Sequence, residues 1–297
     1  MVAAFSSLAA CGRTPEAVPP EIRAEKASRI VPGNAAAAEF LVVLLGEGGA
    51  SRIAALPEQV DGYSSFDFHA SPWSIPQRFA RYTAEPLIAL HPDLVVTHEW
   101  QAAETTQVLR AQGVPVVVLR SARSYEDIRE TLGSLGRTLG LSERAEAAAA
   151  ELDRRVERLR EGAVARTGLR ALEYSNNGTG GWTAGGDTTS DAMIRLAGMR
   201  NAAAEAGLKG HVVLELEKLI AIDPDVIVVG APARDEAGSA TKNVLEKTSA
   251  LANLSAVKNK RIAVLPAALL STDSPRLVDA AERLAKEVDA LVGAGAK

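Results

Sequence analysis

A twelve-residue segment occurs twice in this chain and decides the fold: EPLIALHPDLVV at residues 85–96 and EKLIAIDPDVIV at residues 217–228. The copies share the leading glutamate, the Leu-Ile-Ala triplet and the Pro-Asp pair. In each, the glutamate suits the positive end of a short helix dipole, and the proline ends that helix and turns the chain into an apolar strand. One such turn is common, but two copies on either side of a long helical segment predict two related lobes.

Short apolar runs alternate with helical stretches outward from both copies. Runs without polar alternation are typical of parallel strands that are covered on both faces. We expect an α/β fold of two Rossmann-like lobes with a ligand cleft between them. The predicted strands are residues 29–31, 94–97, 114–119, 170–174, 226–229 and 261–265, and the predicted helices are residues 35–45, 105–112, 124–139, 142–161, 190–197 and 274–292.

Residues 142–161 form the longest predicted helix, rich in alanine and long charged side chains that favour helix. Twenty helical residues reach about 30 Å, enough to link two small lobes; the alternative is an ordinary surface helix of one domain. The expected divisions are a signal segment and tether (1–26), an N-terminal lobe (27–122), connecting helices (123–166) and a C-terminal lobe (167–297).

Composition excludes several classes of function. The chain has 297 residues, 24% of them charged, and a net charge of −4, which gives no basic face for nucleic acid. A single cysteine excludes an intramolecular disulfide and a four-cysteine zinc site. No window is long and apolar enough to cross a bilayer. No hydrolase elbow, His-Glu-x-x-His or Cys-x-x-Cys motif occurs, so we do not expect an enzyme.

The N-terminus offers one further signal. Small residues precede Cys11, as in a bacterial lipobox, where the cysteine is lipidated and becomes the mature N-terminus. No Lys or Arg precedes Cys11, however, and the alternative is a disordered terminus with an incidental cysteine. The proline-containing stretch Gly12–Glu25 suits a solvated tether.

Four features together resemble a known family. They are the opening RIVPGN (29–34), a helix that carries Glu39 and ends at Gly46, the duplicated segment, and LAGMRNA (196–202). In these features the chain is similar to the substrate-binding proteins of ATP-driven (ABC) importers for iron–siderophore complexes, haem and cobalamin. The resemblance covers nearly everything from Ser28 onward and implies two α/β lobes joined by a single long α-helix.

The resemblance also implies partners and a location. A surface glutamate on each lobe docks on arginines of the membrane permease in that family, and the matching positions here are Glu85 and Glu217. The alternative is a pair of helix-start acids that only complement the dipole. The implied protein is a monomer, lipid-anchored on the periplasmic or extracellular face of the membrane, that works with an ABC permease and its ATPase. It has no intrinsic cofactor or metal, because the metal arrives in the ligand, and its lobes close little.

Residues that follow the predicted strands are the candidate ligand contacts, since ligands of parallel sheets bind beyond the carboxyl ends of strands. Aromatic faces suit a large planar chelate, arginines suit its carboxylates, and His or Tyr suits its metal. The alternatives are loop aromatics that pack on their own lobe and histidines with only structural roles. The candidates are Asn34, Tyr63, Phe68, His69, Trp73, His98, Trp100 and Arg120 in the first lobe, and Tyr174, Trp182 and Arg234 in the second.

Two other functions fit the same sequence. A chelatase-like or metal-tetrapyrrole enzyme occurs on a related fold, and turnover of a substrate would reveal it. A sensory binding module is the second alternative, and a neighbouring permease and ATPase would argue against it.

Overall fold

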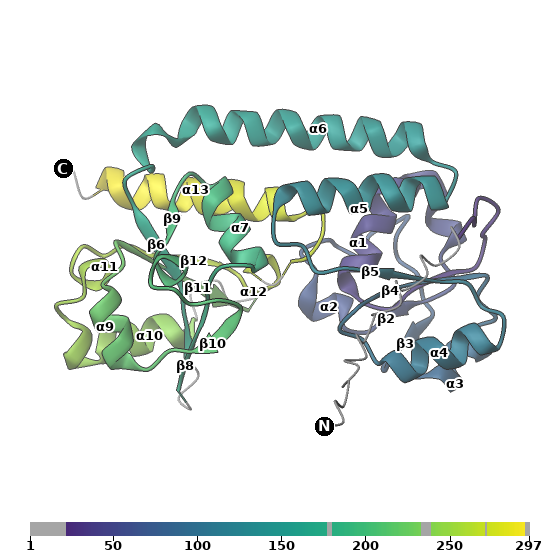
Figure 1. The fold of residues 1–297 in the computed structure, drawn as a ribbon, viewed down its shortest axis with the longest axis horizontal. Coiled ribbons are helices and arrows are strands. Elements are labelled where there is room, and N and C mark those ends of the chain that lie inside the picture. The colour runs from purple at the N-terminus through teal and green to yellow at the C-terminus, as the bar shows by residue number, and fades with distance from the viewer. Residues whose placement is uncertain (1–21, 177–179, 233–238, 271, 295–297) are drawn as a thin grey trace, which may run out of the picture.

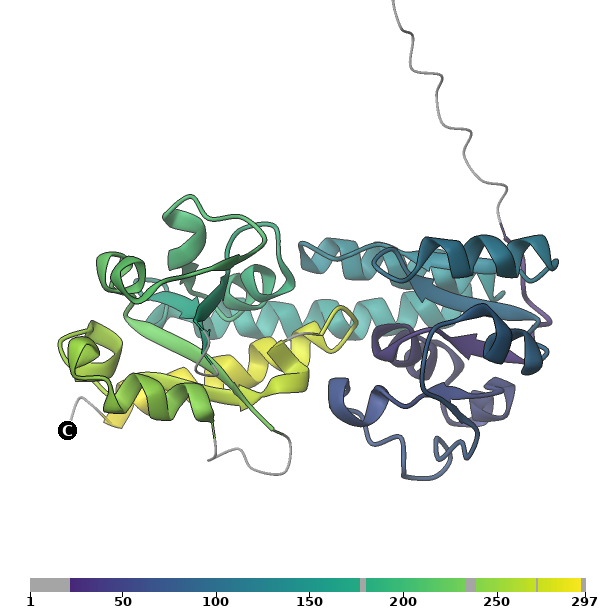
Figure 2. The same cartoon turned by 90° about the horizontal axis from the view of Figure 1, so that it is seen from below.

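The computed structural model describes residues 22–176, 180–232, 239–270 and 272–294. Within these residues the chain forms two α/β bodies side by side, with one long helix across the top of both (Figures 1 and 2). No helix in the described part of the chain combines the length and apolar character needed to cross a membrane.

The first lobe is built on a parallel sheet in the order β1-β4-β5. Ile30 pairs with Leu94, and Val95 pairs with Val116. The strands are β1 (Ile30–Pro32), β4 (Leu94–His98) and β5 (Val116–Leu119), with a small parallel pair of β2 (Leu56–Pro57) and β3 (Arg78–Phe79). The helices are α1 (Ala35–Leu45), η1 (Glu47–Arg52), α2 (Val60–Tyr63), α3 (Ala84–Ala89), α4 (Ala103–Ala111) and α5 (Tyr125–Thr138).

The second lobe has a parallel sheet in the order β12-β11-β6-β9 and an antiparallel sheet in the order β10-β8-β7. Its strands are β6 (Arg170–Glu173), β7 (Ser175–Asn176), β8 (Gly181–Ala184), β9 (Arg200–Asn201), β10 (His211–Val213), β11 (Val226–Ala231) and β12 (Ile262–Pro266). Its helices are α7 (Thr189–Leu196), α8 (Ala202–Glu205), α9 (Leu216–Ile222), α10 (Ala240–Lys247), η3 (Ser249–Leu251), α11 (Ser255–Lys258), α12 (Ala267–Leu270) and α13 (Leu277–Ala294).

The duplicated segment has the same local structure in both lobes. In the first, Asp93 accepts the Arg29 backbone N–H, while the Arg29 side chain donates to the carbonyls that end α3. In the second, Asp225 accepts the Arg170 backbone N–H, and the Arg170 side chain donates to the carbonyls that end α9. The two copies lie in separate sheets, as expected for two related lobes. Each copy also ties a helix end to the first strand of its lobe.

The turn that leaves each repeated helix has an unusual backbone. His91 and Asp223, which occupy the same position in the two copies, both have positive φ, at 48° and 44°. Non-glycine residues adopt this left-handed conformation infrequently. The shared conformation extends the match between the lobes beyond identical residues.

Helix α6 (Ser142–Glu161), followed by the short η2 (Gly162–Ala165), lies along the top of both lobes (Figure 1). It packs on α5 and α1 of the first lobe and on α13 and α7 of the second. Leu132, Leu152 and Val156 share one buried apolar cluster with Val278 and Leu284 of α13. The helix is thus embedded in a core common to both lobes rather than isolated in solvent.

The last helix begins later than the sequence predicts. We expected Ser274 and Pro275 to open it, whereas α13 begins at Leu277. The Ser274 hydroxyl accepts the Arg276 backbone N–H and also donates to Glu39 across the lobes. The Ser274 side chain therefore makes a tertiary contact while it also accepts a backbone N–H just before α13.

Candidate functional site: a cleft between the lobes

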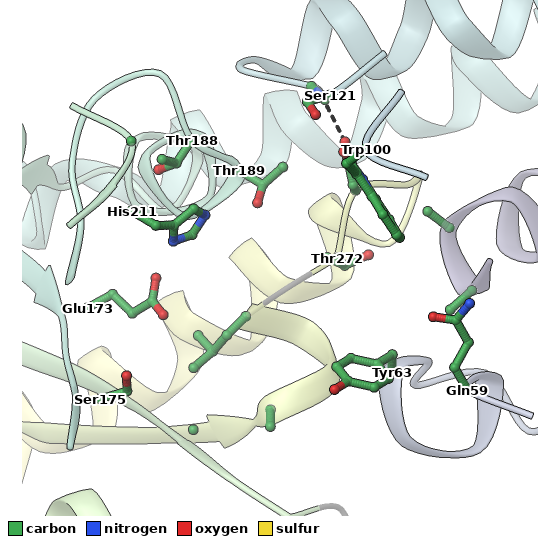
Figure 3. Close-up of a pocket in the computed structure, with 18 of the residues that line it drawn as sticks. Gln59, Tyr63, Trp100, Ser121, Glu173, Ser175, Thr188, Thr189, His211 and Thr272 are labelled. Carbon is green, nitrogen blue, oxygen red and sulfur yellow. Dashed lines mark hydrogen bonds between the residues drawn. The ribbon is translucent and has the colours of Figure 1, made fainter. Parts of the chain in front are cut away.

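A cavity of about 1020 Å³ lies between the two lobes. Both lobes line it, and Figure 3 shows side chains that enter it from opposite sides. Its lining consists of Ala35, Ala36, Glu39, Gln59, Tyr63, Trp100, Ser121 and Ala122 from the first lobe, and of Glu173, Ser175, Asp187, Thr188, Thr189, Gly210, His211, Gly230, Ala231, Pro232, Ala240, Thr241, Ala267, Leu270, Thr272 and Asp273 from the remainder of the chain.

The first-lobe wall carries two exposed aromatic rings. Tyr63, at the end of α2, is 63% exposed, and Trp100, just after β4, is 56% exposed. The indole of Trp100 lies 5.0 Å from the imidazole of His98, centroid to centroid, so a buried neighbour supports it from behind. Large apolar rings left open to solvent inside a cavity are surfaces that a ligand can cover.

Backbone contacts hold the remainder of this wall in place. The buried Asn34 caps α1 by accepting the Ala37 backbone N–H at 2.8 Å, which directs the start of α1 toward the cavity. The Gln59 amide donates to the Gly33 carbonyl at 3.3 Å, and Gln101 donates to the same carbonyl at 3.0 Å. These bonds join α2, the β1–α1 turn and the loop after β4.

The second-lobe wall carries uncharged polar side chains among small apolar residues. Thr188 caps α7 by accepting the Asp191 backbone N–H, and the α7 N-terminus with Thr189 faces the cavity together with Ser175 and His211 (Figure 3). These hydroxyls and the imidazole both donate and accept hydrogen bonds. The wall therefore suits neutral polar groups on a ligand.

Glu173, the last residue of β6, differs from the other acids in this wall, Asp187 and Asp273. Its Oε2 is buried and has no hydrogen-bond partner, while the side chain lines the cavity (Figure 3). Burial raises the pKa of the Glu173 carboxyl above its ordinary value, although a hydrogen bond from Ser190 and the nearby His211 act in the opposite direction. A buried carboxylate oxygen without a donor is costly, so a ligand group that donates to Oε2 would be favoured.

The floor of the cleft is a polar contact between the lobes. Glu39 on α1 accepts hydrogen bonds from Ser64 (2.5 Å), Ser274 (2.5 Å) and Thr272 (3.4 Å), and its Oε1 lies 3.6 Å from Arg276 Nε. Burial raises the pKa of the Glu39 carboxyl, which the hydrogen bonds from Ser274 and Ser64 and the charge of Arg276 partly offset. Glu39 thus links the first lobe to the segment that enters α13.

A second contact between the lobes lies beside the first. Asp273 accepts the Ala122 backbone N–H at 2.8 Å, and its other oxygen lies 2.9 Å from Nε2 of the buried His98. His98 is therefore engaged with a carboxylate behind the cavity wall.

The structure places two of the sequence-predicted ligand residues, Tyr63 and Trp100, in the cavity lining. Asn34 and His98 are buried behind the wall, where they support it. Four others lie away from the lining: His69 is exposed and pairs with Asp61 at 3.0 Å, Arg120 lines a different hollow, Trp182 is half-exposed on β8, and Tyr174 is fully buried in the second lobe.

The aromatic loop after α2 requires a correction. We expected Phe68 and Trp73 to contact ligand, but both are buried in the first-lobe core. Phe66 packs edge-on against each of them, with centroids 4.9 Å and 6.3 Å away. Their rings fill the space between the loop and the sheet, so packing accounts for them. Arg234 and Cys11 lie outside the described residues.

Several lining residues were not among the ligand contacts that the sequence predicts. Glu39 lies inside a predicted helix, and Glu173 ends a strand whose next residue, Tyr174, looked the better candidate. His211 lies on a short strand that we did not predict. A rule that lists residues after strands misses side chains on helices and on added strands. In the described part of the chain, no group of three or more His, Cys, Asp or Glu side chains is placed to hold a metal ion.

The two repeated glutamates lie far from the cavity lining. Glu85 and Glu217 are both exposed in the first turns of α3 and α9. Figure 1 shows these two helices in different lobes, on the side of the molecule away from α6.

Comparison with known proteins gives a consistent result. Residues 67–269 match the family model for periplasmic binding proteins. A cobalamin-binding protein of Halobacterium salinarum is 28% identical over 202 residues, which cover 68% of this chain and 54% of that protein. The chain thus spans about half the length of this relative.

Two further likenesses cover more of the matched protein. An uncharacterized ABC transporter substrate-binding lipoprotein of Bacillus subtilis, YvrC, is 25% identical over 212 residues, covering 69% of this chain and 64% of that protein. The apo structure of the periplasmic haem-binding protein RhuT from Roseiflexus sp. RS-1 superposes with a TM-score of 0.74 at 26% identity, covering 91% of this chain and 99% of that one.

Proposed function

Since the chain belongs to the periplasmic binding protein family, we propose that it is the extracytoplasmic solute-binding protein of an ABC importer. It captures a metal chelate of the haem, siderophore or cobalamin class and delivers it to the permease. Relatives named for cobalamin and haem binding support this ligand class.

The observation that carries the proposal is the cavity between the lobes. Its volume of about 1020 Å³ is at the upper end of the range for small-molecule sites, which suits a ligand as large as a tetrapyrrole or a siderophore. Tyr63 and Trp100 offer it aromatic faces from one side, and Thr189 and His211 offer polar groups from the other. Capture between two lobes lets both contribute to affinity.

Delivery of the ligand to the permease depends on two glutamates on the outer surface. Glu85 and Glu217 are exposed, in equivalent positions of the two lobes, and each is in the first turn of a short helix. Two carboxylates held at fixed positions on a rigid body would orient it on a permease through charge complementarity. We assign them to permease docking.

Release follows from the shared core. The apolar cluster that includes α6 and α13 contains residues of both lobes, and Glu39 and Asp273 add polar bonds between them. Large hinge motion would break this packing. The lobes (residues 27–122 and 167–297), which segment 123–166 connects, therefore move little relative to one another when the ligand binds. The permease separates them for release.

Attachment to the membrane completes the proposal. Cys11 is the lipidation site, and residues 12–25 are the tether that lets the anchored protein reach its permease. YvrC, the Bacillus relative, is named as a lipoprotein, which supports this assignment. Metabolic labelling with a fatty-acid analogue should mark the wild-type chain and leave a Cys11→Ala variant unmarked; labelling of the variant would contradict it.

Spectroscopic titration of the purified chain with haemin, a ferric hydroxamate siderophore and cyanocobalamin tests the ligand class. We expect saturable one-to-one binding of at least one of them, seen as quenching of Trp100 fluorescence. Failure of all three would refute the ligand class. Chemical turnover of a bound chelate would favour an enzyme instead.

A further inference from the structure

The charges that line the cleft are unevenly distributed. Among the described lining residues, four are carboxylates (Glu39, Glu173, Asp187 and Asp273) and none is a lysine or an arginine. Among these same residues, the imidazole of His211 is the only titratable group with a basic nitrogen. Any basic group that offsets these acids in the described part of the chain therefore lies behind the lining, apart from His211.

Three of the four carboxylates are already compensated. Asp187 lies 3.5 Å from the Lys209 ammonium, Asp273 lies 2.9 Å from the His98 imidazole, and Glu39 accepts three hydroxyl bonds with the Arg276 guanidinium nearby. Each of these acids has a partner before any ligand arrives.

Glu173 differs from the other three. Its buried Oε2 has no hydrogen-bond partner, and Figure 3 shows the side chain inside the cavity below His211. A ligand amide N–H that reaches this oxygen would satisfy it, whereas a ligand carboxylate brings only acceptor oxygens and, when Glu173 is ionised, a like charge in a partly desolvated site.

The remaining polar groups of the cavity are neutral. Hydroxyls and one carboxamide can donate to and accept from amide groups, without the bidentate cations that carboxylates prefer. In the described lining they are Gln59, Tyr63, Ser121, Ser175, Thr188, Thr189, Thr241 and Thr272.

We propose that this cleft selects uncharged metal chelates with an amide rim over chelates with free carboxylates, and that Glu173 is the residue that sets this preference. The proposal rests on the function proposed above and narrows its ligand class. Corrinoids and hydroxamate siderophores share the favoured chemistry, whereas haem carries two propionates.

The test compares ligands that differ in charge. Cyanocobalamin, ferrichrome, haemin and haemin dimethyl ester are each titrated into the full chain, with tryptophan fluorescence as the readout. Haemin and its dimethyl ester hold the same iron and ring and differ in the two carboxylates. We expect the ester to bind about tenfold more tightly than haemin, the size of one like-charge repulsion at intermediate dielectric. Cyanocobalamin or ferrichrome should also bind more tightly than haemin. The one that does shows whether the ligand is a corrinoid or a hydroxamate siderophore.

Variants identify the residue responsible. Glu173→Gln removes the charge at nearly constant volume and should reduce the ester-to-haemin affinity ratio about tenfold. The matched control, Glu161→Gln, makes the same charge change at an exposed position on α6, outside the cavity lining, and should leave the ratio unchanged. Circular dichroism and thermal unfolding confirm that both variants fold.

Each outcome gives a definite answer. An ester-to-haemin ratio near one in the wild-type chain, or a ratio that Glu173→Gln does not change, overturns the inference and leaves the importer function intact. Tight haemin binding that Arg234→Ala abolishes also overturns it, since a cation would then serve the propionates. Absence of binding by all four chelates overturns the proposed ligand class itself.

Discussion

Truncation of Trp100 to alanine should weaken chelate binding by a calculable amount. The side chain is 56% exposed in the empty cleft, and a tryptophan of about 250 Å² therefore leaves about 140 Å² to solvent. A planar ligand that stacks on one face would cover about half of this, or 70 Å², and at about 25 cal/mol per Å² the loss is close to 1.8 kcal/mol. Fluorescence is compromised in this variant, so isothermal titration calorimetry is the assay, and the expected result is a Kd raised about 20-fold.

Trp182→Ala provides the matched control. Trp182 is 50% exposed, nearly the same as Trp100, but lies on β8 outside the cavity lining. The control should bind with a Kd within about twofold of wild type, since surface truncations rarely exceed about 0.5 kcal/mol. Stacking of the ligand on Trp100 is refuted if both variants lose affinity equally. It is also refuted if Trp100→Ala binds as tightly as wild type while its melting temperature is unchanged.

Three further predictions concern docking, pH and packing. The double variant Glu85→Ala, Glu217→Ala should bind ligand normally but lower importer-dependent uptake in cells at least tenfold; normal uptake would remove the docking assignment. The folded protein keeps the Glu39 proton to higher pH than the unfolded chain, so stability should fall as the pH rises above the ordinary pKa of a glutamate carboxyl. Glu39→Gln should flatten this fall in thermal melts; an unchanged slope would contradict it. Gly181→Ala places a Cβ 2.2 Å from the Tyr174 hydroxyl oxygen and should lower the free energy of unfolding, measured by chemical denaturation, by about 1–3 kcal/mol. The control Gly48→Ala, whose Cβ would enter open space, should change it little; equal losses would disprove the clash.

The sequence predicts the architecture well because the repeat carries structural information at several levels. The helix, proline turn and strand in each copy match α3–β4 and α9–β11, and the predicted helices 35–45 and 142–161 coincide with α1 and α6. Local rules suffice here, since helix formers, glycine stops and apolar runs act within a few residues of one another.

The site was predictable only in part, because it depends on which side chains the fold leaves uncovered. Tyr63 and Trp100 line the cavity, whereas Phe68 and Trp73, equally aromatic and on the same lobe, are buried in the core. Nothing local distinguishes a ring that packs on its own sheet from one that faces a cleft. The role of Glu39 depends on Ser274, 235 residues away, and no local pattern predicts such a contact.

Hydrogen exchange of the purified chain, with and without its tightest-binding chelate, is the most direct test of ligand binding between the lobes. Ligand should slow exchange in both lobes, at residues 59–63 and 98–101 on one wall and at residues 187–190 and 210–212 on the other, with little change around the exposed helices α3 and α9. Protection confined to one lobe, or found only outside the segments that line the cavity, would show that the ligand does not bind between the lobes.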